Sequence, residues 1–110
     1  MRDDDRIRIR HMLDAAEEIE QFAKGKDRLS LDGNRMLVLA VLKEIEMIGE
    51  AANSVSDKIQ EEFPQIPWGQ IIAMRNRTIH GYFDIDNDIV WKTISEDIPK
   101  LAKELKKILN

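Results

Sequence analysis

Apolar residues recur at three- and four-residue spacing through four long segments of the chain, which is the pattern of amphipathic helices. The first segment runs from about Asp4 to Lys24, with Ile9 and Leu13 on one apolar stripe. Its acidic start suits the positive end of a helix dipole, and the glycine that follows it suits a helix end. The pattern therefore predicts a first helix over these residues.

The second segment is the longest and predicts a single helix from about Arg35 to Glu62. Its apolar stripe consists of Val38, Val41, Ile45, Ile48, Ala52, Val55 and Ile59. Gly49, Ala51 and Ala52 form a patch of small residues, at which we expect another helix to approach closely. Pro64 and Pro67 then interrupt the helical pattern.

Two shorter segments complete the pattern. Pro67 suits the first turn of a third helix that ends at His80, because the next residue is a glycine. Asp86 or Asn87 can cap a fourth helix from Asp88 to Leu109, with a kink expected near Pro99. No alternation typical of strands is present. We therefore predict an all-α bundle of four to five helices, forming a single domain over residues 1–110.

Composition narrows the possible functions. The chain has 110 residues, no cysteine and a formal net charge of −4. That charge argues against non-specific coating of nucleic acid but permits a local basic cleft. The absence of cysteine excludes disulfides and thiolate metal sites. No apolar run approaches the roughly 20 residues of a membrane helix, and the N-terminus resembles no signal peptide. We expect a soluble, cytoplasmic protein without a membrane partner.

The acidic residues do not predict a metal site. Asp84, Asp86 and Asp88 alternate like the first ligands of a calcium loop, but the sixth and twelfth positions hold Ile89 and Ser95. Helix capping and solvation explain these aspartates better. The two histidines, one of them at position 11 and expected at the surface, offer little for zinc. We predict neither a metal nor a cofactor.

The stretch MRNRTIHGYF, residues 74–83, is unusual because no acidic residue occurs between Glu62 and Asp84. On a helix, Asn76 and His80 fall within about 40° of each other, so the amide can orient the imidazole. Arg75 lies about 140° from His80 and reaches the same ligand only through its long side chain. Arg77 lies about 60° from His80.

These residue types suit cleavage of a phosphodiester by its own 2′-hydroxyl. Imidazole moves protons near neutral pH, and a guanidinium binds the phosphate and stabilises its developing charge. Neither step needs a metal. Spacing alone favours a simpler interpretation, a helix end with a capping histidine and solvent-facing arginines.

The sequence R-N-R-T-I-H-G-Y matches the R-x-x-x-x-H-x-Y signature and resembles the HepT-like toxins of the HEPN superfamily. The blocks VLKEIEMIGEAANSVSDKI and FPQIPWGQIIAMRNRTIHGYFDID resemble the same family, and the likeness covers nearly the whole chain. It implies a HEPN-type helical bundle that dimerises, with both motifs along one cleft. It also implies a metal-independent endoribonuclease toxin of a type VII system, neutralised by an MntA-like nucleotidyltransferase antitoxin that adenylylates the motif tyrosine.

The resemblance assigns roles residue by residue. Arg75 and His80 are the expected catalytic pair, Asn76 supports them, Arg77 assists in binding phosphate, and Tyr82 is the position expected to be modified. The expected partners are RNA, a second copy of the chain and the nucleotidyltransferase.

Two other functions remain open. HEPN domains also include non-catalytic dimers that serve as substrate-binding or regulatory subunits of a nucleotidyltransferase. The third possibility is an assembly protein that only dimerises.

The apolar residues also suggest a homodimer. Trp68, Ile71, Ile72 and the small-residue patch together offer more apolar surface than a small four-helix core needs.

Overall fold

The computed structural model describes residues 1–80 and 85–110, and for residues 78–80 it describes the backbone alone. The described residues form helices and no strands, which confirms the predicted all-α class. Its α-helices are α1 (Asp3–Ala23), α2 (Arg35–Ser54), α3 (Asp57–Glu62), α4 (Trp68–His80), α5 (Asn87–Lys92) and α6 (Ile98–Leu109). A 3₁₀ turn, η1 (Arg28–Leu31), and a π-helical turn, η3 (Thr93–Asp97), complete the order.

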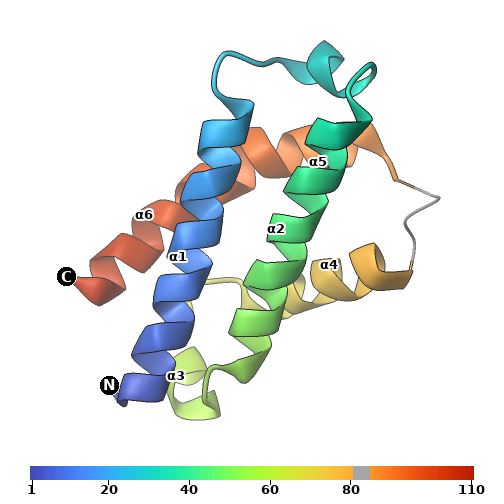
Figure 1. Ribbon diagram of the computed structural model, residues 1–110. Helices are drawn as coiled ribbons and strands as arrows, with labels where there is room; N and C mark the ends of the chain where they lie inside the picture. The colour runs from blue at the N-terminus through green and yellow to red at the C-terminus, as the bar shows by residue number, and fades with distance from the viewer. Residues whose placement is uncertain (81–84) are drawn as a thin grey trace.

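The long helices α1 and α2 lie side by side and antiparallel, and they form the centre of the bundle (Figure 1). Helix α4 packs on α2, whereas α6 packs on α1. The core is mostly aliphatic, and Ile9, Met12 and Ile19 of α1 are fully buried in it. Arg6 at the start of α1 donates a 3.0 Å hydrogen bond to the Leu109 carbonyl at the end of α6, so the two ends of the chain are joined.

The prediction of one continuous helix from Arg35 to Glu62 is wrong, because α2 ends at Ser54 and Ser56 caps the separate helix α3. The Ser56 hydroxyl accepts from the Ile59 amide at 3.4 Å. The Asp5 carboxylate of α1 accepts from both the amide and the hydroxyl of Ser56, each at 2.8 Å. An acceptor 51 residues away therefore stabilises the break.

The apolar stripe of the second segment continues across the break between α2 and α3, so the periodicity does not indicate the break. Val55 and Ile59 are 3% and 4% exposed, so the buried pattern continues although the helix does not. The Gln60 amide donates to the carbonyls of Ala52 and Val55 at 3.2 and 3.1 Å, which satisfies acceptors at the end of α2.

The C-terminal helical segment begins and ends close to the predicted residues, and Asp86 is its N-cap. Its irregularity is the π-helical turn η3, which lies immediately before Pro99 in the first turn of α6. Proline has no N–H, so the regular hydrogen-bond ladder has to change at this position. The Thr93 hydroxyl donates to the Ile89 carbonyl at 2.8 Å and supports the altered turn.

The surface argument for a homodimer needs correction. Trp68 is 7% exposed, with its indole N–H donating to the Phe63 carbonyl at 3.0 Å, and Ala51 and Ala52 are buried. These residues belong to the core of the single chain. On the outer face of α2, Met36 and Met47 are 77% and 46% exposed, and other exposed apolar side chains, such as Ile7 and Leu29, lie on α1 and η1.

Candidate active site

Arg75 lies where α4 packs closely against Gly49 of α2. A Cβ atom on Gly49 would lie only 2.1 Å from the Arg75 Cβ and 3.3 Å from the Ile71 carbonyl oxygen. Any larger residue at position 49 would force the helices apart. The prediction that the small-residue patch admits another helix is confirmed at Gly49, and the helix it admits is α4.

The guanidinium of Arg75 is bonded on two sides. Its Nε and Nη2 atoms donate to Oε1 of Glu50 at 2.9 and 2.5 Å, and Nη1 donates to Oδ1 of Asn76 at 2.8 Å. The Arg75 side chain is 24% exposed and that of Glu50 is 56% exposed. The charged head of Arg75 is therefore held at the surface, at the seam between α2 and α4.

The structure separates the two arginines of the motif. Arg75 faces α2, whereas Arg77 lines a hollow of about 140 Å³ on the side of α4 that faces α5, together with Met74, Ile85 and Ile89. Positions two apart on a helix point about 160° from each other, so this divergence follows from helix geometry. Arg75 and Arg77 therefore face different sides of α4 and do not converge on one phosphate-binding position.

Asn76 bonds to Arg75 in this structure. The expected bond from Asn76 to the imidazole of His80 concerns a side chain outside the described residues, although His80 itself ends α4. Tyr82 and the expected capping glycine also lie outside them, in the segment 81–84.

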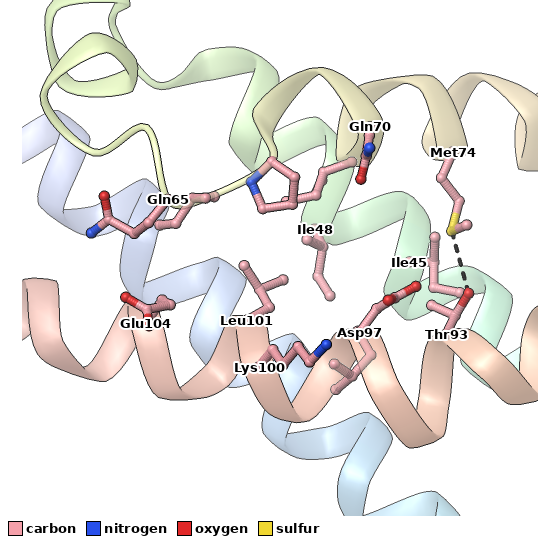
Figure 2. A pocket seen from close by; sticks show the side chains of 14 residues that line it. Ile45, Ile48, Gln65, Gln70, Met74, Thr93, Asp97, Lys100, Leu101 and Glu104 are labelled. Atoms are coloured by element: carbon pink, nitrogen blue, oxygen red, sulfur yellow. Dashed lines mark hydrogen bonds between the residues drawn. The ribbon is translucent and has the colours of Figure 1, made fainter.

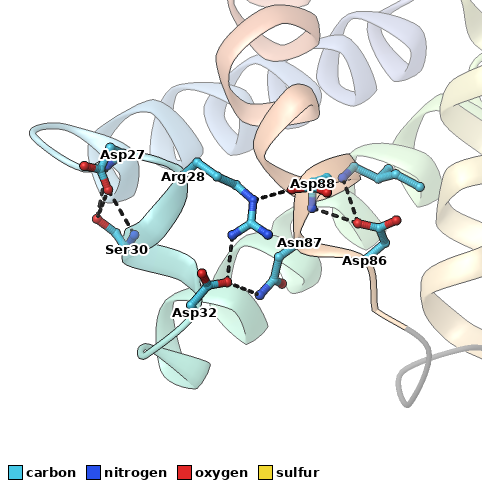
Figure 3. A network of polar contacts seen from close by, with 8 residues as sticks. Asp27, Arg28, Ser30, Asp32, Asp86, Asn87 and Asp88 are labelled. Atoms are coloured by element: carbon cyan, nitrogen blue, oxygen red, sulfur yellow. Dashed lines mark hydrogen bonds and ion pairs between the residues drawn. The ribbon is translucent and has the colours of Figure 1, made fainter.

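A polar network anchors the point at which the chain re-enters a helix after the motif (Figure 3). Arg28 of η1 donates to Asp32 at 2.7 Å and to Asp88 of α5 at 2.6 Å. The Asp86 carboxylate accepts from the amides of Asp88 and Ile89 at 2.8 and 3.4 Å. The hydrogen bond from Arg28 lowers the pKa of Asp32. Asp86 caps α5, as predicted, whereas the ion pair of Asp88 with Arg28 was not predicted, and Asp84 lies outside the described residues. Among the described residues, no cluster of His, Cys, Asp and Glu is arranged to hold a metal ion.

An apolar groove of about 290 Å³ separates α4 from η3 and α6 (Figure 2). Ile45 and Ile48 of α2 lie between the two walls, and the Thr93 hydroxyl points to the Met74 sulfur at 3.8 Å. Arg75 does not line this groove. The groove therefore belongs to a different face from the candidate catalytic arginine.

Glu50 is the residue that sequence reasoning missed. It precedes Arg75 by 25 positions and lies off the apolar stripe, so periodicity gives it no role. The sequence signal that could have indicated Glu50 is its position directly after Gly49. Where a glycine allows a second helix to pack closely, the next side chain lies beside that helix and can contact it.

Comparison with known proteins identifies the family. The family model for ribonuclease HepT-like proteins matches residues 12–108, which include all of α2 and α4. The chain belongs to the HepT-like ribonuclease family. This confirms the resemblance carried by R-N-R-T-I-H-G-Y and the flanking blocks.

Relatives of the HepT-like chain cover most of its length. It is 37% identical over 94 residues to Putative RNase MJ1380 of Methanocaldococcus jannaschii, covering 86% of each chain. It is 33% identical to Putative RNase TTE0752 of Caldanaerobacter subterraneus, covering 92% of this chain and 90% of the relative. It is 32% identical to Probable ribonuclease HepT of Thermococcus cleftensis, covering 91% of each. No solved structure matches the chain.

None of the helices in the described part of the HepT-like chain combines the length and apolar character needed to cross a membrane.

Proposed function

We propose that this protein is a metal-independent RNA endonuclease, and that it acts in the cytoplasm as the toxin of a type VII toxin–antitoxin pair. The supporting observation is membership of the HepT-like ribonuclease family together with an intact R-x-x-x-x-H-x-Y motif on and after α4. The substrate would be RNA, because the proposed chemistry uses the 2′-hydroxyl that DNA lacks.

Two side chains, His80 and Arg75, have separate roles in the reaction. The 2′-oxygen of the substrate bonds to phosphorus while the bond from phosphorus to the 5′-oxygen breaks. The 2′-hydroxyl loses a proton and the departing 5′-oxygen gains one; His80 performs one of these two transfers and water performs the other. Arg75 stabilises the additional negative charge on the phosphoryl oxygens with its forked donors. The products would carry a 2′,3′-cyclic phosphate and a 5′-hydroxyl.

The active form would be a two-fold dimer that joins the outer faces of two α2 helices. Met36, Leu39 and Met47 are 77%, 38% and 46% exposed, and on an α-helix they share one face with Glu50. Because Glu50 holds Arg75, a dimer through this face would bring the two motifs toward one groove. Concentrating two sets of cations there would offset the net charge of −4.

Regulation would come from a nucleotidyltransferase partner that modifies Tyr82. The phenol oxygen would attack the α-phosphate of ATP, forming a phosphodiester and releasing pyrophosphate. The attached adenylate adds bulk and a negative charge two residues after His80, where it can pair with the guanidinium that otherwise binds RNA.

The decisive experiment incubates purified protein, free of any partner, with total RNA and EDTA. We expect cleavage to persist with the chelator and to fall about a hundredfold or more in His80→Ala and in Arg75→Ala. Both variants should keep the thermal stability of the wild type to within a few degrees. Activity that requires a divalent ion, or that survives both substitutions, would reject the proposal.

The modification is tested by co-expression with an MntA-like nucleotidyltransferase. The intact mass should rise by one or more adenylate units, located by fragmentation on the peptide that contains Tyr82. Tyr82→Phe should stay folded and escape inactivation. Equal silencing of Tyr82→Phe and wild type would show that the partner inhibits by another route.

The net charge of −4 favours a second candidate, a non-catalytic HEPN dimer that serves as substrate or regulatory subunit of the nucleotidyltransferase. That function predicts binding and modification by the partner without any cleavage of RNA by the free protein.

A further inference from the structure

We propose that Glu50 is a positioning residue for Arg75, fixing the guanidinium in the orientation that phosphate stabilisation requires. This inference rests on the proposed ribonuclease function and adds to it a carboxylate outside the motif. It starts from the two hydrogen bonds that Glu50 Oε1 accepts from Nε and Nη2 of Arg75.

Two adjacent residues of α2 determine where Arg75 lies. Gly49 leaves room for its aliphatic stem, whose Cβ and Cγ lie 2.1 and 2.7 Å from the place that a Cβ on Gly49 would occupy. Glu50 then holds the charged head through two donors on one edge of the guanidinium. An arginine side chain has several rotatable bonds, so without such a contact its head samples many positions. Constraining both stem and head leaves a narrow range of orientations.

The Glu50–Arg75 pair contributes little to the stability of the fold. The Glu50 side chain is 56% exposed, and pairs this accessible contribute little because water screens them. The close packing of α4 against α2 at Gly49 does not depend on the Glu50 carboxylate either, since Cβ and Cγ of Arg75 and the Ile71 carbonyl make that contact. The value of the pair therefore lies in orientation.

The same carboxylate opposes the binding of RNA. It places a negative charge against the cation that is to meet the phosphate, and it lines a hollow on its other side with Arg8 and His11 of α1. Removing the charge of Glu50 leaves this surface more attractive to a polyanion. Removing Glu50 should therefore impair the orientation of Arg75 while strengthening the binding of RNA. A residue with only a structural role would not produce these opposite effects.

The experiment measures kcat and KM separately for Glu50→Ala and Glu50→Gln on one defined RNA. Glu50→Ala removes both acceptor and charge, so kcat should fall about tenfold while KM falls or stays constant. Glu50→Gln keeps an amide oxygen that accepts from Arg75, so it should regain most of kcat and retain the lower KM. Glu61→Gln on the exposed surface of α3 is the charge-matched control and should change neither constant appreciably.

A second measurement does not depend on activity. The Nε–Hε signal of Arg75, identified by its loss in Arg75→Lys, should exchange slowly with water in wild type and in Glu50→Gln. It should exchange rapidly in Glu50→Ala. Rapid exchange in wild type overturns the inference whatever the nuclease assay shows.

The outcomes separate the two proposals. An unchanged or increased kcat in Glu50→Ala overturns the positioning role, as does an equal loss of kcat and thermal stability in both Glu50 variants. A wild-type protein that protects the Arg75 signal but cuts no RNA rejects the proposed function, and with it the catalytic purpose of the pair.

Discussion

At the scale of single residues, Glu44 is the buried group with the least favourable surroundings. It is 7% exposed, and its Oε2 atom lacks a hydrogen-bond donor among the described residues. Burial raises the pKa of Glu44, and the neighbouring carboxylate of Glu18 raises it further. A charge at this position therefore opposes folding at neutral pH.

We predict that Glu44→Gln stabilises the protein at pH 7 by about 1 kcal/mol, a rise of several degrees in Tm. The folded-state pKa lies above the ordinary 4.5, so wild type is penalised at any pH above the folded value. The penalty vanishes as the pH falls toward 4.5 and the carboxyl protonates. Thermal unfolding from pH 4 to pH 8 should show the two proteins converging at the acid end.

Glu17→Gln is the matched control, because Glu17 is an exposed carboxylate on α1. It should leave Tm nearly unchanged across the same pH range. A loss of stability in Glu44→Gln at pH 7 would mean that the buried oxygen finds a donor in solution.

Asp5 has the opposite electrostatic character. It is 4% exposed, and the hydrogen bond from the Ser56 amide lowers its pKa more than burial raises it. A lowered pKa means that ionised Asp5 stabilises the fold above the ordinary value of 3.8. That contribution is lost as the pH falls through the folded-state pKa.

At the scale of helices, Asp5 ties the start of α1 to the start of α3. We predict that Asp5→Asn destabilises the protein by about 1–3 kcal/mol at pH 7, because a charged acceptor of two hydrogen bonds is lost. Denaturant unfolding at pH 7 and pH 3 should show this difference shrinking at the lower pH. Asp4→Asn, an exposed neighbour, should have a much smaller effect at both.

The contact between α2 and α4 requires a glycine at position 49. We predict that Gly49→Ala destabilises the protein by about 1–3 kcal/mol, since the new methyl group would lie 2.1 Å from the Arg75 Cβ. The shift of α4 should also reduce RNA cleavage. Chemical denaturation and the nuclease assay check the two effects.

Gly69→Ala is the internal control for that substitution. Gly69 also lies in a helix, but a Cβ there has open space within 4 Å. Alanine at this position should stabilise the protein by up to about 1 kcal/mol, as helix propensity alone predicts. If both substitutions stabilise, the close approach at Gly49 does not persist in solution.

At the scale of the whole molecule, the proposed dimer depends on the outer face of α2. We predict that wild type scatters light with twice the mass of the 12.8 kDa chain at micromolar concentration. Met36→Glu with Met47→Glu should give a folded monomer, because charges replace the exposed apolar side chains of that face. A wild-type mass near 12.8 kDa would reject the dimer, and an unaffected mass in the double variant would reject this interface.

Local patterns within the sequence determined the helical class and most helix positions. The stripe of Ile9 and Leu13 marks α1, and Asp86 marks the start of α5, because periodicity and capping depend on residues within one or two turns. The motif from Arg75 to Tyr82 carried the family resemblance, since its residues are contiguous in the sequence.

Only the tertiary structure decided which distant residues act on these local elements. Asp5 ends the predicted second helix early by binding Ser56 across 51 positions, and Glu50 holds Arg75 across 25. Neither pairing leaves a periodic signal, because a hydrogen bond between helices depends on how their axes approach. Here that approach is permitted by a missing side chain at Gly49, whose effect appears only when α4 lies against it.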